Sequence, residues 1–413
     1  MSPRLAFTLP VLLAIPAAAY ALRHVRIIQL ESLRERIIWT FHSWRANYPV
    51  PLDIDQWQLN TAKEYQNELW KQVPDLKRPW EFLESFFAAR GYTLYRPSPS
   101  NVWAFYPPPK TDATKPHWEP QFPYARRIYN EDRDIVFSYS SPRVWAARDI
   151  QGRDVVIRMI SGRESSDELK IFQRLNTPEV RADPRNHSIY ALDYINFDGL
   201  IFVVMPRWNE AFHHCDFHNV REIMHFMECL LEGVDFLHEH RIAHCDLLEP
   251  NTGVNVLAPM HILYLKGICD PAVAKYAIYD FGQSVIYPYN TVLEDVTVTK
   301  FLHFDLRGCP TPPGPHNPFH FDVLCLGVML QNRVRHIEDI VPDIGPFFDS
   351  MITDDTTKRF TARQALHEFR EIYLRLSPSQ LDSLVTGRLW LDGHVKTKLD
   401  LPTRVWTPPP ECT

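Results

Sequence analysis

Three side chains in RIAHCDLLEPNTG, residues 241–253, have the types and spacing that phosphoryl transfer uses. His244, Asp246 and Asn251 follow the pattern H-x-D-x-x-x-x-N, and Asp280 follows downstream in YAIYDFGQS. The reaction needs a carboxylate beside the incoming hydroxyl and oxygen ligands for a hard divalent ion. Asp246 suits the first role, while Asn251 and Asp280 suit the second. We expect His244 to pack as a structural residue rather than to act as the base.

The segments that must position these residues change character along the chain. From about residue 130 the apolar residues alternate, which predicts strands. One short helix is predicted over 165–175, opened by a capping box from Ser165 to Glu168. Beyond this region the apolar residues recur at helical spacing, as in the stripe from Ile223 to Leu237. The pattern indicates an α+β chain in which a β-rich part precedes a helical part.

Two further elements give the pattern a family resemblance. FDVLCLGVML carries Asp322 and Gly327, and KRFTARQAL carries Arg359 and Thr361. With the H-x-D-x-x-x-x-N and D-F-G motifs in this order, the chain resembles the eukaryotic protein kinase family. Among its members, it looks most like the divergent kinase-like proteins of mushroom-forming fungi.

The resemblance covers roughly residues 130–374 and implies a two-lobed protein kinase fold. A small β-rich N-lobe with one helix would span 130–208, and a larger, mainly helical C-lobe would span 209–374. The family's roles, carried onto matching positions, make Asp246 the catalytic base. Asn251 and Asp280 would be the metal ligands, and the implied cofactors are ATP and Mg²⁺.

Four further positions match nucleotide contacts of the family. Arg158, in VVIRMI, stands at the place of the strand lysine and would contact the phosphates. Its helix partner would be Glu168, although Glu168 also fits the third position of the capping box. Val144 and Met205 would border the adenine, with Met205 at the position that gates the adenine pocket.

Several positions depart from the family pattern. Phe137, Tyr139 and Pro142, in FSYSSPRV, stand where three glycines are expected. Glycines there let backbone N–H groups approach phosphates, and side chains hinder the same approach. Cys245 and Leu248 replace an arginine and a lysine of the catalytic loop. The loss of one preorganised charge typically costs on the order of 10²- to 10³-fold in rate.

Three functions therefore compete. The first is a slow Ser/Thr protein kinase that uses Mg-ATP. The second is a pseudokinase scaffold that keeps the fold with little or no turnover. The third is a small-molecule kinase of the aminoglycoside or choline type, which shares the H-x-D-x-x-x-x-N motif. The long insertion between Asn251 and Asp280 could serve as a partner surface.

The N-terminus predicts a membrane connection. Residues 5–22 contain no charge, and 18 helical residues span roughly 27 Å, close to the thickness of a bilayer core. We expect residues 1–26 to form a single-pass signal anchor with the kinase-like domain in the cytosol. The rivals are a cleaved signal peptide followed by entry into the secretory pathway, and a buried helix. A helical extension with a proline-rich connector would follow over 27–123, and a tail over 375–413.

Bulk composition narrows the partners. The net charge of -6 argues against nucleic acid, because that partner attracts basic surfaces. The seven cysteines include no C-x-x-C, so neither a disulfide framework nor a zinc site is expected. The remaining partners are a protein substrate or scaffold partner, and a membrane through the N-terminal segment.

Overall fold

The computed structural model describes residues 37–58, 69–108, 122–128, 135–138, 141–211, 217–259, 265–299, 314–391, 393–397 and 404–405. The chain divides into two compact units, Met1–Leu52 and Asp53–Thr413. In the first unit, residues 37–46 form a helix, within the range 27–123 predicted for the helical extension and its connector. All other elements belong to the second unit.

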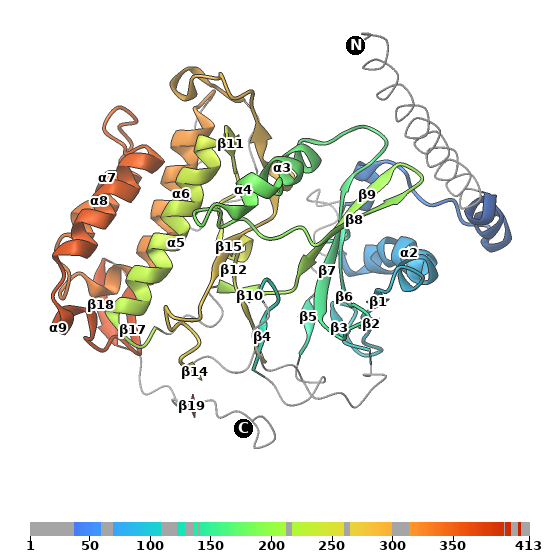
Figure 1. The fold of residues 1–413 in the computed structure, drawn as a ribbon, viewed down its shortest axis with the longest axis horizontal. Helices are drawn as coiled ribbons and strands as arrows, with labels where there is room; N and C mark the ends of the chain where they lie inside the picture. The colour runs from blue at the N-terminus through green and yellow to red at the C-terminus, as the bar shows by residue number, and fades with distance from the viewer. Residues whose placement is uncertain are drawn as a thin grey trace, which may run out of the picture. The chain divides into compact units, whose positions relative to one another are not determined.

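The helices of the second unit are α2 (Leu69–Ala88), α3 (Asp167–Leu175), α4 (Pro178–Ala182), α5 (Val220–Glu239), α6 (Pro318–Val334), α7 (Ile344–Ile352), α8 (Ala362–Arg375) and α9 (Pro378–Leu381). Its largest sheet has five antiparallel strands in the order β1 (Thr93–Leu94), β6 (Val144–Arg148), β7 (Asp154–Ser161), β9 (Leu200–Pro206) and β8 (Asp193–Phe197). In Figure 1, the helices α5 to α8 gather away from this sheet, and α3 and α4 lie between them.

The smaller sheets connect distant segments. They are β2 (Arg96–Pro97), β3 (Ala104–Tyr106) and β5 (Phe137–Ser138); β10 (Asn209–Glu210), β12 (Thr252–Val254) and β15 (Tyr276–Ile278); β11 (Ile242–Ala243) and β16 (Val285–Ile286); β13 (Val256–Leu257) and β4 (Arg126–Arg127); β14 (Leu265–Lys266) and β19 (Arg404–Val405); and β17 (Arg388–Leu391) and β18 (His394–Thr397). β13 and β14 lie in the insertion between Asn251 and Asp280, and each pairs with another segment of this chain.

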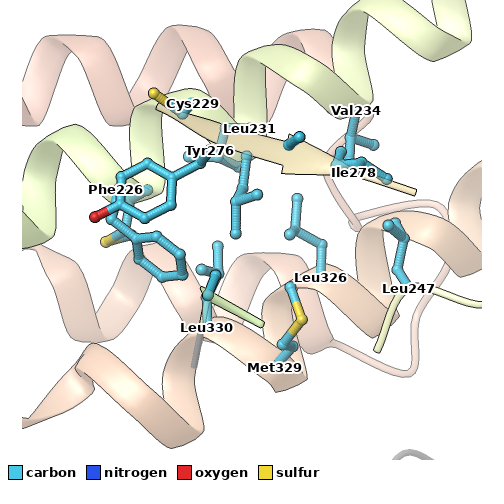
Figure 2. Close-up of a cluster of buried hydrophobic side chains, with 14 of the residues drawn as sticks. Phe226, Cys229, Leu231, Val234, Leu247, Tyr276, Ile278, Leu326, Met329 and Leu330 are labelled. Atoms are coloured by element: carbon cyan, nitrogen blue, oxygen red, sulfur yellow. The ribbon is translucent and has the colours of Figure 1, made fainter. Parts of the chain in front are cut away.

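The helical part is built around one apolar core between α5, α6 and β15. Figure 2 shows this core, in which α5 contributes Phe226, Cys229, Leu231 and Val234, β15 contributes Tyr276 and Ile278, and α6 contributes Leu326, Met329 and Leu330. Leu247, which directly follows Asp246, is also buried in it. The loop with the predicted catalytic residues is thus anchored to the core through its own side chain.

An aromatic cluster ties α2 to the five-stranded sheet. Trp80 of α2 is fully buried, and its ring centroid lies 5.7 Å from those of both Trp145 on β6 and Phe202 on β9. The Trp80 indole N–H also donates to the Pro142 carbonyl at 2.7 Å. Residues 53–58 and 69–108, which the sequence places before the kinase-like region, therefore belong to the same compact unit as that region.

The start of α3 differs from the sequence prediction. The N-cap is Ser166, whose hydroxyl accepts a hydrogen bond from the Leu169 N–H at 3.0 Å. The capping box from Ser165 to Glu168 is therefore wrong. The helix begins one residue later than predicted, which leaves the Glu168 side chain available to other partners.

The predicted single-pass membrane localisation is contradicted. No helix within the described part of the chain is both long enough and apolar enough to cross a bilayer. The two 20-residue helices, α2 and α5, carry charged residues along their length, which a hydrocarbon environment opposes. The anchor helix is likewise unsupported, and the apolar run 5–22 lies outside the described residues.

We expect Trp80→Ala to lower the free energy of unfolding by about 3 to 5 kcal/mol, because truncating a buried aromatic side chain leaves a cavity. Urea unfolding followed by circular dichroism measures the change. Leu374→Ala is the control, because Leu374 is 80% exposed and its removal should change stability by less than about 0.5 kcal/mol. Equal effects of the two substitutions would contradict the role of α2 in the core.

Candidate active site

The backbone of the predicted catalytic loop is held by one buried carboxylate. Asp322 on α6 is 1% exposed and accepts hydrogen bonds from the His244 N–H at 2.7 Å and the Cys245 N–H at 2.8 Å. The imidazole Nε2 of His238 lies 3.0 Å from the same carboxylate. Cys245 has a φ of 62°, a conformation that L residues seldom adopt. The hydrogen bonds to Asp322 stabilise this turn and thereby fix the backbone position of the next residue, Asp246.

Strand pairing brings Asn251 beside Asp280. Asn251 immediately precedes β12 and Asp280 follows β15 by two residues, and these strands are antiparallel, with Thr252 opposite Ile278. The Tyr279 N–H donates to the Asn251 carbonyl at 3.0 Å. His244 Nε2 lies 3.0 Å from the Tyr279 carbonyl, so His244 joins the two loops. This agrees with the structural role expected for His244.

Asp246 and Asn251 form a directed pair. The Asn251 side-chain amide donates to the Asp246 carbonyl at 2.8 Å and to Asp246 Oδ2 at 3.0 Å. Asp246 Oδ1 is buried and forms no hydrogen bond within the described part of the chain. Burial raises the pKa of the Asp246 carboxyl, and the negative charge of Asp280 acts in the same direction. The raised pKa makes the Asp246 carboxylate a stronger base, and its Oδ1 has no hydrogen-bond partner among the described residues that would compete with a substrate hydroxyl.

Arg158 connects the sheet, α3 and the D-F-G loop. Its Nε donates to Glu168 Oε1 at 2.6 Å, which shows that Glu168 faces Arg158 instead of capping the helix. Its two terminal nitrogens donate to both oxygens of Asp280, at 2.5 and 3.2 Å. Arg158 and Glu168 are almost fully buried, whereas the Asp280 side chain is 34% exposed.

The charges of this cluster stabilise one another. Burial alone would raise the pKa of Asp280, but the neighbouring Arg158 and Arg143 lower it overall. Burial alone would lower the pKa of Arg158, but Asp280 and Glu168 raise it overall. A bidentate guanidinium–carboxylate pair is among the strongest hydrogen-bonded pairs in proteins. In this state, both oxygens that Asp280 would offer to a metal ion are bound to Arg158.

Phe281, the second residue of D-F-G, packs between the loop and α3. Its ring centroid lies 5.5 Å from that of Phe172 on α3 and 5.4 Å from that of His244. Asp280 itself has a φ of 66° and accepts a hydrogen bond from the Gly282 N–H at 3.3 Å. These ring contacts hold Phe281 between α3 and the loop that carries His244.

The two apolar positions predicted at the adenine lie on neighbouring parts of the sheet. Val144 begins β6 directly opposite Arg158, and Met205 lies on β9 opposite Val156. Met205 is buried and Val144 is half-buried. Their contact with a nucleotide stays a prediction.

The departures from the family pattern have different structural outcomes. Pro142 lies in the turn before β6, Phe137 lies on β5, and Tyr139 is outside the described residues. Leu248 is half-buried and directly precedes a short 3-10 helix, Glu249–Asn251. Arg359, which the resemblance includes, donates to the Thr353 carbonyl at 2.6 and 3.0 Å.

The sequence reasoning missed two residues of the site. Arg143 donates to Glu168 Oε2 at 3.2 Å and therefore belongs to the same charge cluster as Arg158. Trp80 holds the preceding carbonyl, that of Pro142, as described above. A cation directly after the proline of the glycine-free turn was a signal for Arg143. No local signal could have found Trp80, because 62 residues separate it from Pro142.

The oxygen set suits Mg²⁺ only in part. Within the described residues, no group of three or more His, Cys, Asp or Glu side chains could hold a metal ion. Asn251 uses its NH₂ group toward Asp246, which leaves its carbonyl oxygen as a potential ligand. Asp280 could contribute only after Arg158 releases at least one carboxylate oxygen.

Comparisons with known proteins give limited support. No model of a protein family matches the chain, and no curated protein matches it. A similar solved structure is the one titled "Crystal structure of Rad53 kinase domain and SCD2", which is 16% identical and has a TM-score of 0.36. The match covers 57% of this chain and 85% of that chain. At these values the likeness carries no functional information.

The five-stranded sheet is linked to α3 by the ion pair between Arg158 and Glu168. The loop that carries Asp246 is held to α6 by the hydrogen bond from the His244 N–H to Asp322. The chain has a mixed fold of helices and strands, and its assignment to the protein kinase fold stays a prediction. Its narrower placement with proteins of mushroom-forming fungi stays a prediction.

We expect Asp322→Ala to lower the free energy of unfolding by about 2 to 5 kcal/mol, because buried N–H groups would lose their acceptor. Denaturant titration measures this change. Asp382→Ala is the control, because the Asp382 side chain is 65% exposed in its pair with Arg221 and such pairs contribute at most about 1 kcal/mol. A loss at Asp322 no larger than the control would refute its anchoring role.

Proposed function

We propose that this protein binds Mg-ATP and transfers its terminal phosphoryl group slowly to a Ser or Thr hydroxyl of a protein. The observation that supports the proposal is the meeting of Asp246, Asn251 and Asp280 at one edge of the β12–β15 pair. The acceptor class is inferred from the resemblance, because a hydroxyl on any molecule would satisfy Asp246.

Asp246 would act on the hydroxyl. Asn251 fixes Oδ2, and the free Oδ1 can accept the hydroxyl proton as the oxygen attacks phosphorus. The raised pKa of Asp246 favours that proton transfer at the cost of a smaller ionised fraction in acid. A bound Mg²⁺ would neutralise charge on the phosphates, and Asn251 and Asp280 are the residues that would hold it.

Slow turnover follows from the ion pair at Asp280. Both of its oxygens are occupied by Arg158, so a metal ion must compete with a short, bidentate pair that is partly buried. Leu248 supplies no charge at the position of the family's loop lysine. Each of these features removes electrostatic stabilisation from the transferred group.

The test uses the full chain, Mg-ATP and casein as a generic acceptor. We expect Mg-ATP to raise the melting temperature and a slow transfer of labelled phosphate. Asp246→Asn should reduce the transfer rate by about 10²-fold or more while nucleotide binding stays, because the base is lost. Asp382→Asn, at an exposed site, should leave both unchanged. Absence of a nucleotide-dependent shift in the wild type would rule out the proposed function.

A second candidate, a pseudokinase scaffold, is favoured by the same Arg158–Asp280 pair. If the resting geometry is permanent, Asp280 never reaches a metal ion and the fold serves only to bind a partner. The third candidate, a small-molecule kinase, gains no support, because Asp322 on α6 and Thr361 at the start of α8 belong to elements of the protein kinase pattern.

Arg158→Lys separates the first two candidates. A lysine carries one ammonium and cannot hold both oxygens of Asp280 while bound to Glu168. In a slow kinase, we expect the variant to transfer phosphate several-fold faster at saturating Mg²⁺, since Asp280 is released. The rate of labelled transfer measures the effect. A variant that binds ATP and still shows no transfer would favour the pseudokinase scaffold.

A further inference from the structure

The turn between β5 and β6 carries an arginine that faces the D-F-G loop. Arg143 directly precedes β6, and its carbonyl accepts a hydrogen bond from the Met159 N–H at 2.8 Å, so its backbone lies beside Arg158. The preceding residue, Pro142, is held by the buried indole of Trp80. The backbone of Arg143 is therefore fixed from both sides, by β7 and by α2.

Two guanidinium groups converge above Gly282. The Nη2 atoms of Arg158 and Arg143 lie 2.7 and 2.8 Å from the point that a Cβ on Gly282 would occupy. A Cβ there would require at least one of these guanidinium groups to move. Arg158 approaches from β7, and Arg143 approaches from the turn before β6. Arg158 pairs with the partly exposed carboxylate of Asp280, and Arg143 interacts with that carboxylate electrostatically.

Arg143 keeps donor capacity that the cluster does not use. Its Nη1 donates to Glu168 Oε2, but its Nη2 forms no hydrogen bond within the described part of the chain. Its side chain is 13% exposed, so bulk water replaces few of the missing partners. Burial lowers the pKa of Arg143, and the positive charge of Arg158 lowers it further. Glu168 and Asp280 balance the two positive charges of the cluster, and the unused Nη2 donor of Arg143 can still bind a further anion.

We propose that Arg143 and Arg158 together bind the phosphates of a nucleotide, in place of the backbone N–H groups of a glycine-rich loop. This inference rests on the proposed nucleotide binding and names the residues that would bind the phosphates of the nucleotide. Guanidinium groups present paired donors that match phosphate oxygens, so two of them can offset the loss of several backbone donors. In this arrangement the turn needs no glycine, because the side chain of Arg143, rather than the backbone of the turn, contacts the phosphates.

A purely structural role for Arg143 makes a different prediction. If it only neutralises Glu168, its removal would disturb α3 and weaken every ligand alike, whether or not the ligand carries phosphate. A phosphate contact weakens only the phosphorylated ligands. Adenosine and ATP therefore distinguish the two roles.

The experiment measures the dissociation constants of ATP, adenosine and inorganic triphosphate by calorimetry on the full chain. We expect Arg143→Gln to weaken ATP and triphosphate about tenfold or more, because a charge-assisted contact is lost, and to leave adenosine unchanged. Arg143→Lys should restore part of the affinity. Arg163→Gln is the matched control, because the Arg163 side chain is 65% exposed and lies in the loop before α3.

Each other outcome is decisive. Unchanged ATP and triphosphate affinity in Arg143→Gln, or an equal loss for adenosine, would overturn the proposal while the proposed function stands. A wild type that binds triphosphate but neither ATP nor adenosine would support the anion site and reject nucleotide binding. A wild type that binds none of the three would overturn both. Melting curves of each variant establish that it is folded.

Discussion

The ion pairs of Arg158 join three parts of the molecule that are far apart in the sequence. One guanidinium holds Glu168 on α3 and Asp280 in the D-F-G loop, so the sheet, the helix and the helical part meet at a single group. Desolvation opposes the burial of these charges, and only complete pairing offsets it. The position of α3 and the state of Asp280 are therefore coupled. Any ligand that draws Arg158 away must supply another partner for Asp280.

The two sides of this cluster are supported by different means. On the helical side, Asp322 holds the loop backbone, and Leu247 inserts into the core between α5 and α6. On the sheet side, support comes from α2, whose Trp80 packs against the strands and holds the turn before β6. A segment that precedes the kinase-like region in the sequence thus becomes part of its interior. This explains how a turn without glycine can keep a defined position.

Phosphate recognition in this fold can be achieved in two physical ways. A flexible glycine turn lets backbone N–H groups approach the ligand, whereas a braced turn with an arginine places a guanidinium there. Here the turn carries Pro142 and Arg143, and the D-F-G glycine opposite them leaves room for both guanidiniums. In the proposed mode of phosphate binding, the missing glycines and the added arginine act together at one site.

The sequence by itself identified the side chains of the two kinase-like motifs, because the spacing within each motif reflects local backbone geometry. H-x-D-x-x-x-x-N and D-F-G name the oxygen-bearing side chains that lie together in the structure. Asp198-Gly199 is a local turn signal of the same kind, and the structure forms the turn between β8 and β9 there. The start of α3 was off by one residue, since Ser165 and Ser166 are equally good caps and only packing chooses between them.

Only the tertiary structure decided what the charges do. Arg158 and Asp280 are 122 residues apart, and nothing in their local sequence indicates that Arg158 takes both oxygens of Asp280. The same holds for Arg143, whose importance depends on α2 and on the space above Gly282. Spacing along the chain fixes residue types on one element, whereas ion pairs between elements depend on how side chains from distant segments fill a shared, water-poor space.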